Sequence, residues 1–330
     1  MLNSNELLTY PVGELSEIIQ AFITYKRSLG LKYKIEEDTL IRFSILSLEY
    51  EIKEKTIPHE LIEAYFKKRN GEKNITYNTR IGLINRFLNF SKKYDFIFSL
   101  PEIPKLKNEK YQPYIFTSEE IGRFFKASDN LKHYTGSQRH IIAPILFRLI
   151  YSCGLRATEA INLKSEHIDW GHNTLTIYNG KNSKDRLVPF SDTVKSVLET
   201  YHIRYRMNDH ENTFLFPSKY NKQLTRHMVY KWFRYTLEAA GIPHLGKGFG
   251  PREHDLRHSF CVHTLKNMQS QGIDLYVCLP LLSNYLGHVS IRETQDYLRL
   301  SAEFYPEIEK IMRKYTGNVI PTGGIHDEAN

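Results

Sequence analysis

The sequence predicts a mainly α-helical protein of two domains, with a small antiparallel β-hairpin or sheet in the second domain. A length of 330 residues is enough for two hydrophobic cores. Apolar residues recur at helical spacing through most of the chain, and only residues 174–178 and 186–190 alternate with a period of two. Residues 98–116 are rich in proline and lysine and lack a helical period, so we expect an extended interdomain linker there.

The composition is that of an ordinary globular protein with a moderate basic excess. The 45 Lys+Arg against 37 Asp+Glu give a net charge of +8, which favours a polyanionic partner without establishing one. The three cysteines have no CxxC spacing and are expected to be buried and reduced. No signal-peptide pattern opens the chain, and its longest apolar stretch is too short to cross a bilayer. We therefore expect a cytoplasmic protein with no membrane partner.

Residues 1–97 are predicted to form a bundle of four helices. The helical period runs over approximately residues 14–30, 36–50, 58–69 and 75–94. In the last of these helices we expect Arg80 and Arg86 to point outward. Outward cations can contact the phosphates of a nucleic acid, and they can equally form a solvated face.

Residues 117–315 are predicted to form the second domain, followed by a flexible C-terminal tail over residues 316–330. Thr117–Glu120 has the form of a capping box and opens the first helix. Further helices are expected over residues 138–153, 192–206 and 226–240.

Turns of this second domain carry basic side chains. Arg156 comes directly after Gly154-Leu155, where the apolar helix ends, and Glu159 follows three residues later. The turn between the two predicted strands carries Lys181 and, three residues on, Lys184. Each of these residues by itself is typical of an ordinary turn or a helix ion pair.

The densest polar run is residues 251–260. On a helix, His254, Arg257, His258 and Cys261 share one face. The His-x3-His spacing with a nearby cysteine is compatible with a metal site. A guanidinium on the same face disfavours a divalent cation and favours an anion such as phosphate.

A tyrosine follows on a short capped helix. Gly287-His288 closes one helix, and Ser290 with Glu293 has the spacing of a capping box that opens the next. Tyr297 lies in that next helix, nine residues after His288. A tyrosine in such a place is usually a packing residue, so any catalytic role depends on the other positions.

Taken together, these motifs resemble those of the tyrosine recombinase, or phage integrase, family. The resemblance covers the whole second domain, and the helical first domain looks like the core-type DNA-binding domain of that family. The family's six active-site positions have matching residues here in the same order: Arg156, Lys181, His254, Arg257, His288 and Tyr297.

The resemblance implies roles for these residues. Arg156 and Arg257 would clamp the scissile phosphate, because a planar guanidinium can bind two phosphate oxygens at once. His254 and His288 would donate hydrogen bonds to its oxygens or assist proton movement. Tyr297 would attack the phosphate and leave a 3′-phosphotyrosyl link with a free 5′-hydroxyl. Phosphoryl transfer of this kind needs mainly positioning and charge stabilisation, so no metal or cofactor is expected.

Two further positions stay open. Lys181 corresponds to the family's general acid, which protonates the leaving hydroxyl, and Lys184 is the competing candidate. Glu159 matches a carboxylate that supports the site in the family, and an ordinary helix ion pair is its alternative role.

Partners also follow from the resemblance. Double-stranded DNA is the expected substrate, with no small-molecule substrate, and the chain would assemble into a tetramer on that DNA. The apolar residues of the last helix, around residues 304–312, would either pack on their own domain or dock on a neighbouring protomer. Side chains that could contact DNA are Arg80, Arg86, Arg226, His227 and Lys231.

The sequence therefore predicts a site-specific recombinase that exchanges DNA strands through a Holliday junction, integrating or excising a mobile element. A Xer-like resolvase of chromosome or plasmid dimers shares all these residues and is the first alternative. A catalytically silent DNA-binding protein of the same fold is the second. A zinc-dependent hydrolase built on the histidines of residues 251–260 is the third.

Overall fold

The computed structural model describes residues 10–102, 106–107, 112–178, 180, 185–207, 213–219, 221–244, 246, 250–288, 290–295 and 297. The chain divides into two compact units, Met1–Tyr111 and Gln112–Asn330, called unit 1 and unit 2 below. Lys181, Lys184, the apolar residues around 304–312 and the tail over residues 316–330 lie outside the described residues. The predictions made for them are not tested by the structure.

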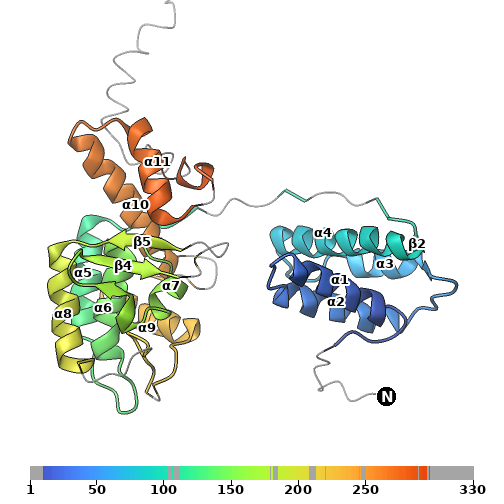
Figure 1. Cartoon of the computed structure of the whole chain (residues 1–330), viewed down its shortest axis with the longest axis horizontal. Helices are drawn as coiled ribbons and strands as arrows, with labels where there is room; N and C mark the ends of the chain where they lie inside the picture. The colour runs from blue at the N-terminus through green and yellow to red at the C-terminus, as the bar shows by residue number, and fades with distance from the viewer. Residues whose placement is uncertain are drawn as a thin grey trace, which may run out of the picture. The chain divides into compact units, whose positions relative to one another are not determined.

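Unit 1 is the expected bundle of four helices (Figure 1). A one-turn 3-10 helix, η1 (Lys92–Tyr94), extends the last of them. Two residues of β1 (Thr56–Ile57) pair in parallel with β2 (Ile97–Phe98). The helices are α1 (Ser16–Ser28), α2 (Lys34–Ser47), α3 (His59–Phe66) and α4 (Asn74–Ser91).

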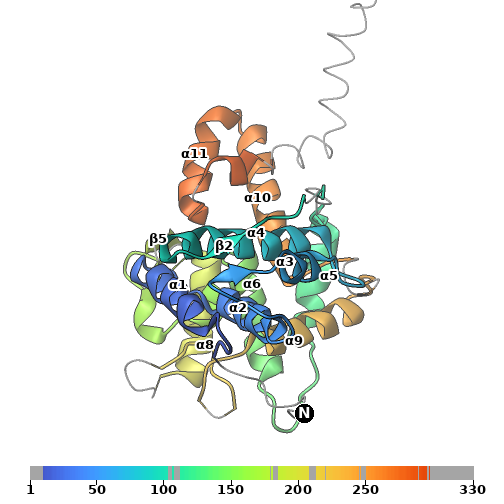
Figure 2. The same cartoon turned by 90° about the vertical axis from the view of Figure 1, so that its right-hand side faces the viewer.

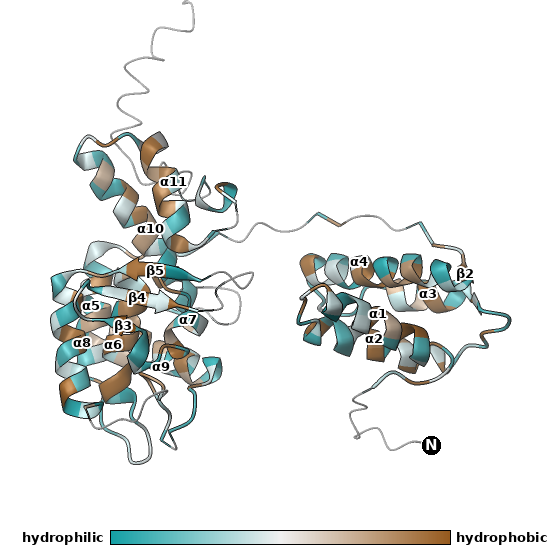
Figure 3. Cartoon of the chain, in the orientation of Figure 1, coloured by the Kyte–Doolittle hydropathy of each residue, from teal (hydrophilic) through white to brown (hydrophobic). Residues whose placement is uncertain are grey.

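Aromatic side chains fill the centre of unit 1. Phe22, Phe43 and Phe87 come from three different helices and are almost completely buried. Phe87 meets the other two edge-on, at ring-centroid distances of 5.8 and 6.1 Å, the arrangement that aromatic quadrupoles favour. Figure 3 shows polar and apolar residues alternating along these helices, as expected for helices with one buried face.

The outward orientation predicted for Arg80 is wrong. Its side chain is 5% exposed, and its guanidinium donates to both carboxylate oxygens of Glu72, at 2.9 and 2.7 Å. It also donates to the backbone carbonyls of Tyr65 and Lys67. A buried arginine needs such partners to offset its lost hydration. Arg80 is thus a structural residue of unit 1 and is not available to DNA, whereas Arg86 on the same helix is exposed.

Both ends of the predicted linker belong to the folded units. Phe98 lies in β2 of unit 1. Phe116 is fully buried in the core of unit 2, and its backbone N–H donates to Ser259 Oγ at 2.9 Å. The division between Tyr111 and Gln112 falls inside the predicted segment, which is therefore shorter than residues 98–116.

Unit 2 is mainly helical with a three-stranded antiparallel sheet in the order β3-β4-β5. The predicted hairpin pairs β4 (Thr174–Ile177) with β5 (Arg186–Pro189), and Ile177 faces Arg186 in its register. The short strand β3 (Ile168–Asp169) was not predicted. The helices are α5 (Ser118–Asp129), α6 (Arg139–Ser152), α7 (Ala157–Ile161), α8 (Asp192–Tyr205), α9 (Arg226–Ala239), α10 (Glu253–Ser270) and α11 (Leu275–Leu286), with a 3-10 turn η2 (Ser165–His167).

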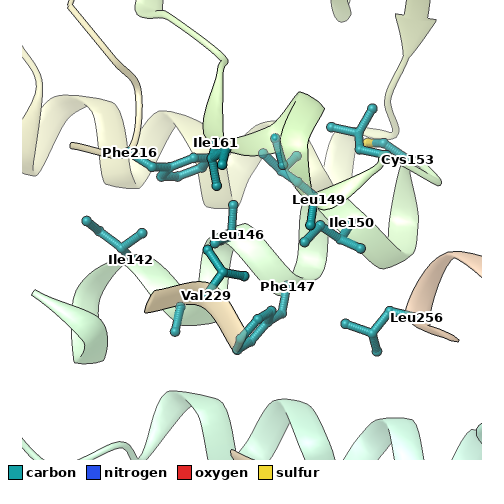
Figure 4. Close-up of a cluster of buried hydrophobic side chains, with 14 of the residues drawn as sticks. Ile142, Leu146, Phe147, Leu149, Ile150, Cys153, Ile161, Phe216, Val229 and Leu256 are labelled. Atoms are coloured by element: carbon teal, nitrogen blue, oxygen red, sulfur yellow. The ribbon is translucent and has the colours of Figure 1, made fainter. Parts of the chain in front are cut away.

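Helix α6 forms the centre of this unit. Its apolar side chains meet Val229 of α9, Leu256 of α10 and Ile161 of α7 (Figure 4). The capping box predicted for α5 is present, since Thr117 Oγ1 accepts from the backbone N–H of Glu120 at 3.1 Å. Burial of this large apolar surface is the main force that holds the surrounding helices in place.

Helices α10 and α11 form a smaller cluster of their own within unit 2. Figures 1 and 2 show the two helices side by side, beyond the ends of the other helices of the unit. Buried side chains of α10 and α11 pack there with Tyr297, which is 4% exposed. The three cysteines are buried and free, as predicted. Within the described residues, every helix is too short or too polar to cross a bilayer.

Candidate active site

Arg156 stands at the junction of α6 and α7. The turn needs Gly154, which has φ +58° and lies so close to Phe260 that an added Cβ would be 2.7 Å from its ring. Glu159 accepts from the backbone N–H of Arg156 at 2.8 Å and from its Nη1 at 2.7 Å. The Nη2 of Arg156 donates to the carbonyl of Gly287 at 3.4 Å. Local sequence thus fixes Arg156 at the start of a helix, beside the end of α11.

Glu159 binds a second arginine that the sequence analysis missed. Arg186, the first residue of β5, donates from Nη1 and Nη2 to the two carboxylate oxygens at 2.9 and 2.8 Å. Its Nε donates to the carbonyl of Tyr285 at 3.1 Å. Arg186 therefore ties the hairpin to both α7 and α11. The 27-residue separation from Glu159 left no local signal, although a charged residue opening an otherwise apolar strand was a hint.

The carboxyl group of Glu159 is held in its charged form. Burial would raise its pKa, but hydrogen bonds and charge from Arg186, together with Arg156, hold the pKa at about 2. This carboxylate offsets part of the positive charge of the arginines around it.

Arg257 is the most deeply buried of the group, with a side chain 1% exposed. It donates to the carbonyls of Gly154 at 2.6 Å and Leu286 at 2.8 Å, and its Nη1 lies 3.9 Å from Glu159. Each guanidinium carries five N–H groups, so donors of Arg257 and Arg156 remain beyond the bonds just given. The two arginines predicted to clamp a phosphate therefore both lie close to the carboxylate of Glu159.

His288 is placed by the end of α11. Gly287 has φ +66° and closes the helix, and the backbone N–H of His288 donates to the carbonyl of Ser283 at 3.0 Å. The Nε2 of His288 lies 3.1 Å from Arg257 Nη2 and must accept, because arginine only donates. Its Nδ1 lies 2.8 Å from Thr294 Oγ1, in the segment that carries Tyr297.

Tyr297 lies against both histidine-bearing elements. Its ring stacks on His288 at 6.0 Å, and its hydroxyl oxygen is 3.0 Å from Nδ1 of His258. Burial and then Cys261 raise the pKa of Tyr297, against the effect of Arg257, so the resting residue is a neutral phenol. Residues 292–295 and 297 are helical, and Ser290 Oγ accepts from the backbone N–H of Arg292 at 3.3 Å. Ser290 thus lies at the start of this helix, and its capping box with Glu293 stays a prediction.

His254 and His258 lie one turn apart on α10, with ring centroids 4.6 Å apart. Burial, followed by the charges of Arg257, Arg156 and Arg226, lowers the pKa of His254 to about 4. Burial, His254 and Arg257 lower the pKa of His258 to about 3. Both rings are therefore neutral at physiological pH. His258, considered before only as part of a metal site, is the second functional candidate that the sequence analysis missed.

The remaining predicted contacts to DNA lie on α4 and α9. Arg86, His227 and Lys231 are exposed. The side chain of Arg226 is 63% exposed and forms an ion pair with Glu253 at 2.7 Å. These four residues stay predictions as DNA contacts.

The arrangement is that of an anion site. Three guanidinium groups surround Glu159, neighbouring imidazoles are neutral, and a tyrosine hydroxyl lies at the edge of the cluster. An excess of fixed positive charge stabilises a phosphate and the charge that develops on it during transfer. Within the described part of the chain, no three His, Cys, Asp or Glu side chains converge as metal ligands would.

Comparison with known proteins gives consistent matches. Residues 115–303 match the model of the phage integrase family. The protein y4rB of Sinorhizobium fredii, whose name classes it among integrases and recombinases, is 30% identical over 301 residues, which cover 88% of this chain and 94% of the relative. Tyrosine recombinase XerC of Staphylococcus aureus is 26% identical over 278 residues, covering 81% of this chain and 85% of the relative.

A solved structure has the same fold. The XerH site-specific recombinase bound to palindromic difH substrate, in a post-cleavage complex, superposes with a TM-score of 0.66 at 17% identity. The match covers 94% of this chain and 99% of that chain.

Proposed function

The chain belongs to the phage integrase family and is a site-specific recombinase of the tyrosine type, and on that premise we propose that Tyr297 is the nucleophile that cuts and rejoins its DNA. The observation that carries the proposal is the position of the Tyr297 hydroxyl, 3.0 Å from His258 and close to Arg257.

The reaction begins when a DNA phosphate enters beside Arg156 and Arg257. Donors on both guanidinium groups bind its oxygens and stabilise the charge that builds up as the phosphorus becomes five-coordinate. His254 and His288 act at the same oxygens. The Tyr297 oxygen forms a bond to phosphorus, the bond to the 5′-oxygen breaks, and a 3′-phosphotyrosyl link results. The link keeps the energy of the phosphodiester, so rejoining needs no external energy source and no cofactor.

The leaving 5′-oxygen takes a proton from Lys181, with Lys184 as the competing donor. A 5′-bridging phosphorothiolate separates the two, because its sulfur leaving group departs without a proton. Lys181→Ala should cleave ordinary DNA slowly, by about a hundredfold or more, and the thiolated DNA at nearly the wild-type rate. Lys184→Ala is the matched control. If the sulfur restores Lys184→Ala and not Lys181→Ala, the roles are reversed.

The direct test is covalent capture. The protein is incubated in EDTA with a nicked suicide DNA site, and a 3′-adduct is sought on a denaturing gel. The adduct should survive chelation and disappear in Tyr297→Phe. Tyr151→Phe is the matched control, because its hydroxyl also lies against a histidine of α10, His263, at 2.8 Å. An adduct that still forms in Tyr297→Phe would sink the proposal, and its loss in EDTA would favour a zinc-dependent hydrolase.

The partner and the cellular role belong to the same proposal. We propose that the chain acts on double-stranded DNA as a tetramer in the cytoplasm, exchanging strands through a Holliday junction. The exposed side chains of Arg86, His227 and Lys231 support contacts with the phosphate backbone. The division into two compact units supports a DNA-binding domain in unit 1 and a catalytic domain in unit 2.

The favoured role is integration or excision of a mobile element, and resolution of chromosome or plasmid dimers is the alternative. Sequencing the DNA captured covalently on Tyr297 in cells separates them. Capture at the flanks of the encoding gene supports the mobile element, whereas capture at one distant chromosomal site supports the resolvase. A catalytically silent DNA-binding protein would be enriched on DNA without any covalent link.

A further inference from the structure

Three polar side chains lie at the hydroxyl of Tyr297, and their chemistry differs. Arg257 carries only N–H donors and cannot accept a proton. Burial raises the pKa of the Cys261 thiol to about 12, so this group keeps its own proton. His258 presents Nδ1 at 3.0 Å and is the member of the three with a basic lone pair.

His288 also contacts Tyr297, but in a different geometry. Its ring lies nearly parallel to the tyrosine ring, at an interplanar angle of 18°. Its Nε2 accepts from Arg257 and its Nδ1 lies 2.8 Å from Thr294. The ring nitrogens of His288 thus contact Arg257 and Thr294, whereas Nδ1 of His258 contacts the tyrosine hydroxyl directly.

The surroundings of His258 leave its ring neutral, with a lone pair on one nitrogen. Its neutral ring offers the Nδ1 lone pair at physiological pH, because burial, His254 and Arg257 lower its pKa to about 3. In the resting protein the proton stays on Tyr297, whose own pKa is raised by burial. A phosphate that enters beside Arg257 brings negative charge, which offsets the charge that weakens the histidine as a base. Bound phosphate thus makes the transfer less unfavourable than it is in the resting protein.

We propose that His258 is the general base of strand cleavage and takes the Tyr297 proton through Nδ1 as the hydroxyl attacks phosphorus. The proposal rests on the proposed function of Tyr297. The O–H bond breaks, an N–H bond forms on His258, the tyrosine oxygen bonds to phosphorus, and the bond to the 5′-oxygen breaks. The leaving oxygen receives a separate proton from the general acid. On rejoining, His258 returns its proton to the tyrosine oxygen.

The first measurement is single-turnover cleavage of the suicide site by His258→Ala and His258→Gln. Glutamine keeps a hydrogen-bond acceptor for the hydroxyl but has no useful basicity, so it separates holding the tyrosine from deprotonating it. Both variants should cleave about a hundredfold or more slowly, with unchanged DNA affinity. The matched control is His263→Gln on the same helix, which loses the equivalent contact with Tyr151 and should cleave at close to the wild-type rate.

A second measurement distinguishes a base from a packing residue. Replacing Tyr297 by a ring-fluorinated tyrosine lowers the pKa of the attacking hydroxyl, so deprotonation needs less help. The fluorinated residue should recover most of the rate lost in His258→Gln and have little effect in the protein with His258. The 5′-bridging phosphorothiolate should not rescue His258→Gln, because the missing step is on the nucleophile side.

Cleavage by His258→Gln at the wild-type rate, or a slow rate that fluorinated tyrosine does not change, would overturn the proposal. If His258→Ala fails to fold, His258→Gln and the fluorinated tyrosine in the wild-type background still decide it. Failure of the proposed function looks different, because the unaltered protein would then form no adduct or Tyr297→Phe would still form one.

Discussion

Arg80 and Arg86 lie on the same helix, α4, but in different surroundings. Arg80 is enclosed with Glu72, whereas Arg86 is exposed. An exposed arginine such as Arg86 can bind a phosphate. A buried arginine such as Arg80 instead stabilises the carboxylate that is buried with it.

Replacing these two arginines should separate stability from binding. Arg80→Met leaves Glu72 buried without its partner and should lower the free energy of unfolding by about 3–5 kcal/mol. Arg86→Met should change that stability by less than about 0.5 kcal/mol, while weakening DNA binding and reducing the slope of log affinity against log salt by about one. Urea denaturation and a salt series of fluorescence anisotropy measure the two effects. An unchanged salt slope in Arg86→Met would remove that residue from the DNA interface.

The pH dependence of stability should report the buried carboxylate of Glu159. Its folded pKa of about 2 lies below the ordinary value of 4.5, so it contributes stability above pH 4.5 that is lost as the pH falls toward 2. That contribution is on the order of 3 kcal/mol. Urea unfolding between these pH values should show a smaller loss of stability in Glu159→Gln than in the unaltered protein. Glu166→Gln, with a side chain 45% exposed, is the control, and equal pH slopes in all three proteins would contradict the prediction.

At the scale of elements, the end of α11 packs closely against the start of β5. Arg186 packs on Gly287, where an added Cβ would lie 3.0 Å from Arg186 Cδ. The same arginine holds Glu159 and the carbonyl of Tyr285. The side chain of Arg186 therefore connects the hairpin to α7 and to the turn before His288. A shift of any of these elements would disturb the other two.

Gly287→Ala tests this arrangement against a matched glycine. Gly241 ends α9 with φ +65°, nearly the value at Gly287, but an added Cβ there would meet nothing within 4 Å. Both alanine variants should lose about 1–2 kcal/mol of stability from the left-handed backbone. Gly287→Ala should additionally displace Arg186 and slow single-turnover cleavage, whereas Gly241→Ala should not. Equal cleavage rates would mean that the contact with Arg186 has no catalytic consequence.

At the scale of the whole molecule, each unit has its own hydrophobic core. The buried residues of unit 1 and those of unit 2 form separate clusters. The basic excess is also shared, with 18 basic and 15 acidic residues in Met1–Tyr111 and 27 and 22 in the remainder, so +3 and +5 sum to the net +8. Two separately folded, weakly basic units joined in one chain can bind DNA more tightly together than either does alone.

Truncation tests this independence. The fragment 112–330 should unfold in a single cooperative transition, because its core needs no residue of unit 1. Its DNA affinity should fall at least about tenfold relative to the full chain. Thermal unfolding followed by circular dichroism, and anisotropy at several salt concentrations, measure the two quantities. A fragment that binds as tightly as the full chain would show that unit 1 contributes no contact with DNA.

The sequence by itself determined most elements of this protein, because helical and strand periods, caps and stop signals are local; β3 and α7 were not predicted. The bundle of unit 1, the hairpin of unit 2 and the capped start of α5 were all predicted from such patterns. It also pointed to Arg156, His254, Arg257, His288 and Tyr297 through a resemblance of motifs, and the structure brings these five together.

Only the tertiary structure decided which charged groups meet. It buried Arg80 against Glu72, joined Arg186 to Glu159, and set His258 against Tyr297 across 39 residues of chain. Such pairs leave no periodic pattern in the sequence. Their two residues lie on different elements, and the packing of apolar side chains elsewhere determines where those elements lie. A buried charge or hydroxyl must then find whatever partner the packing brings within reach, because leaving it unpaired costs several kcal/mol at most buried sites.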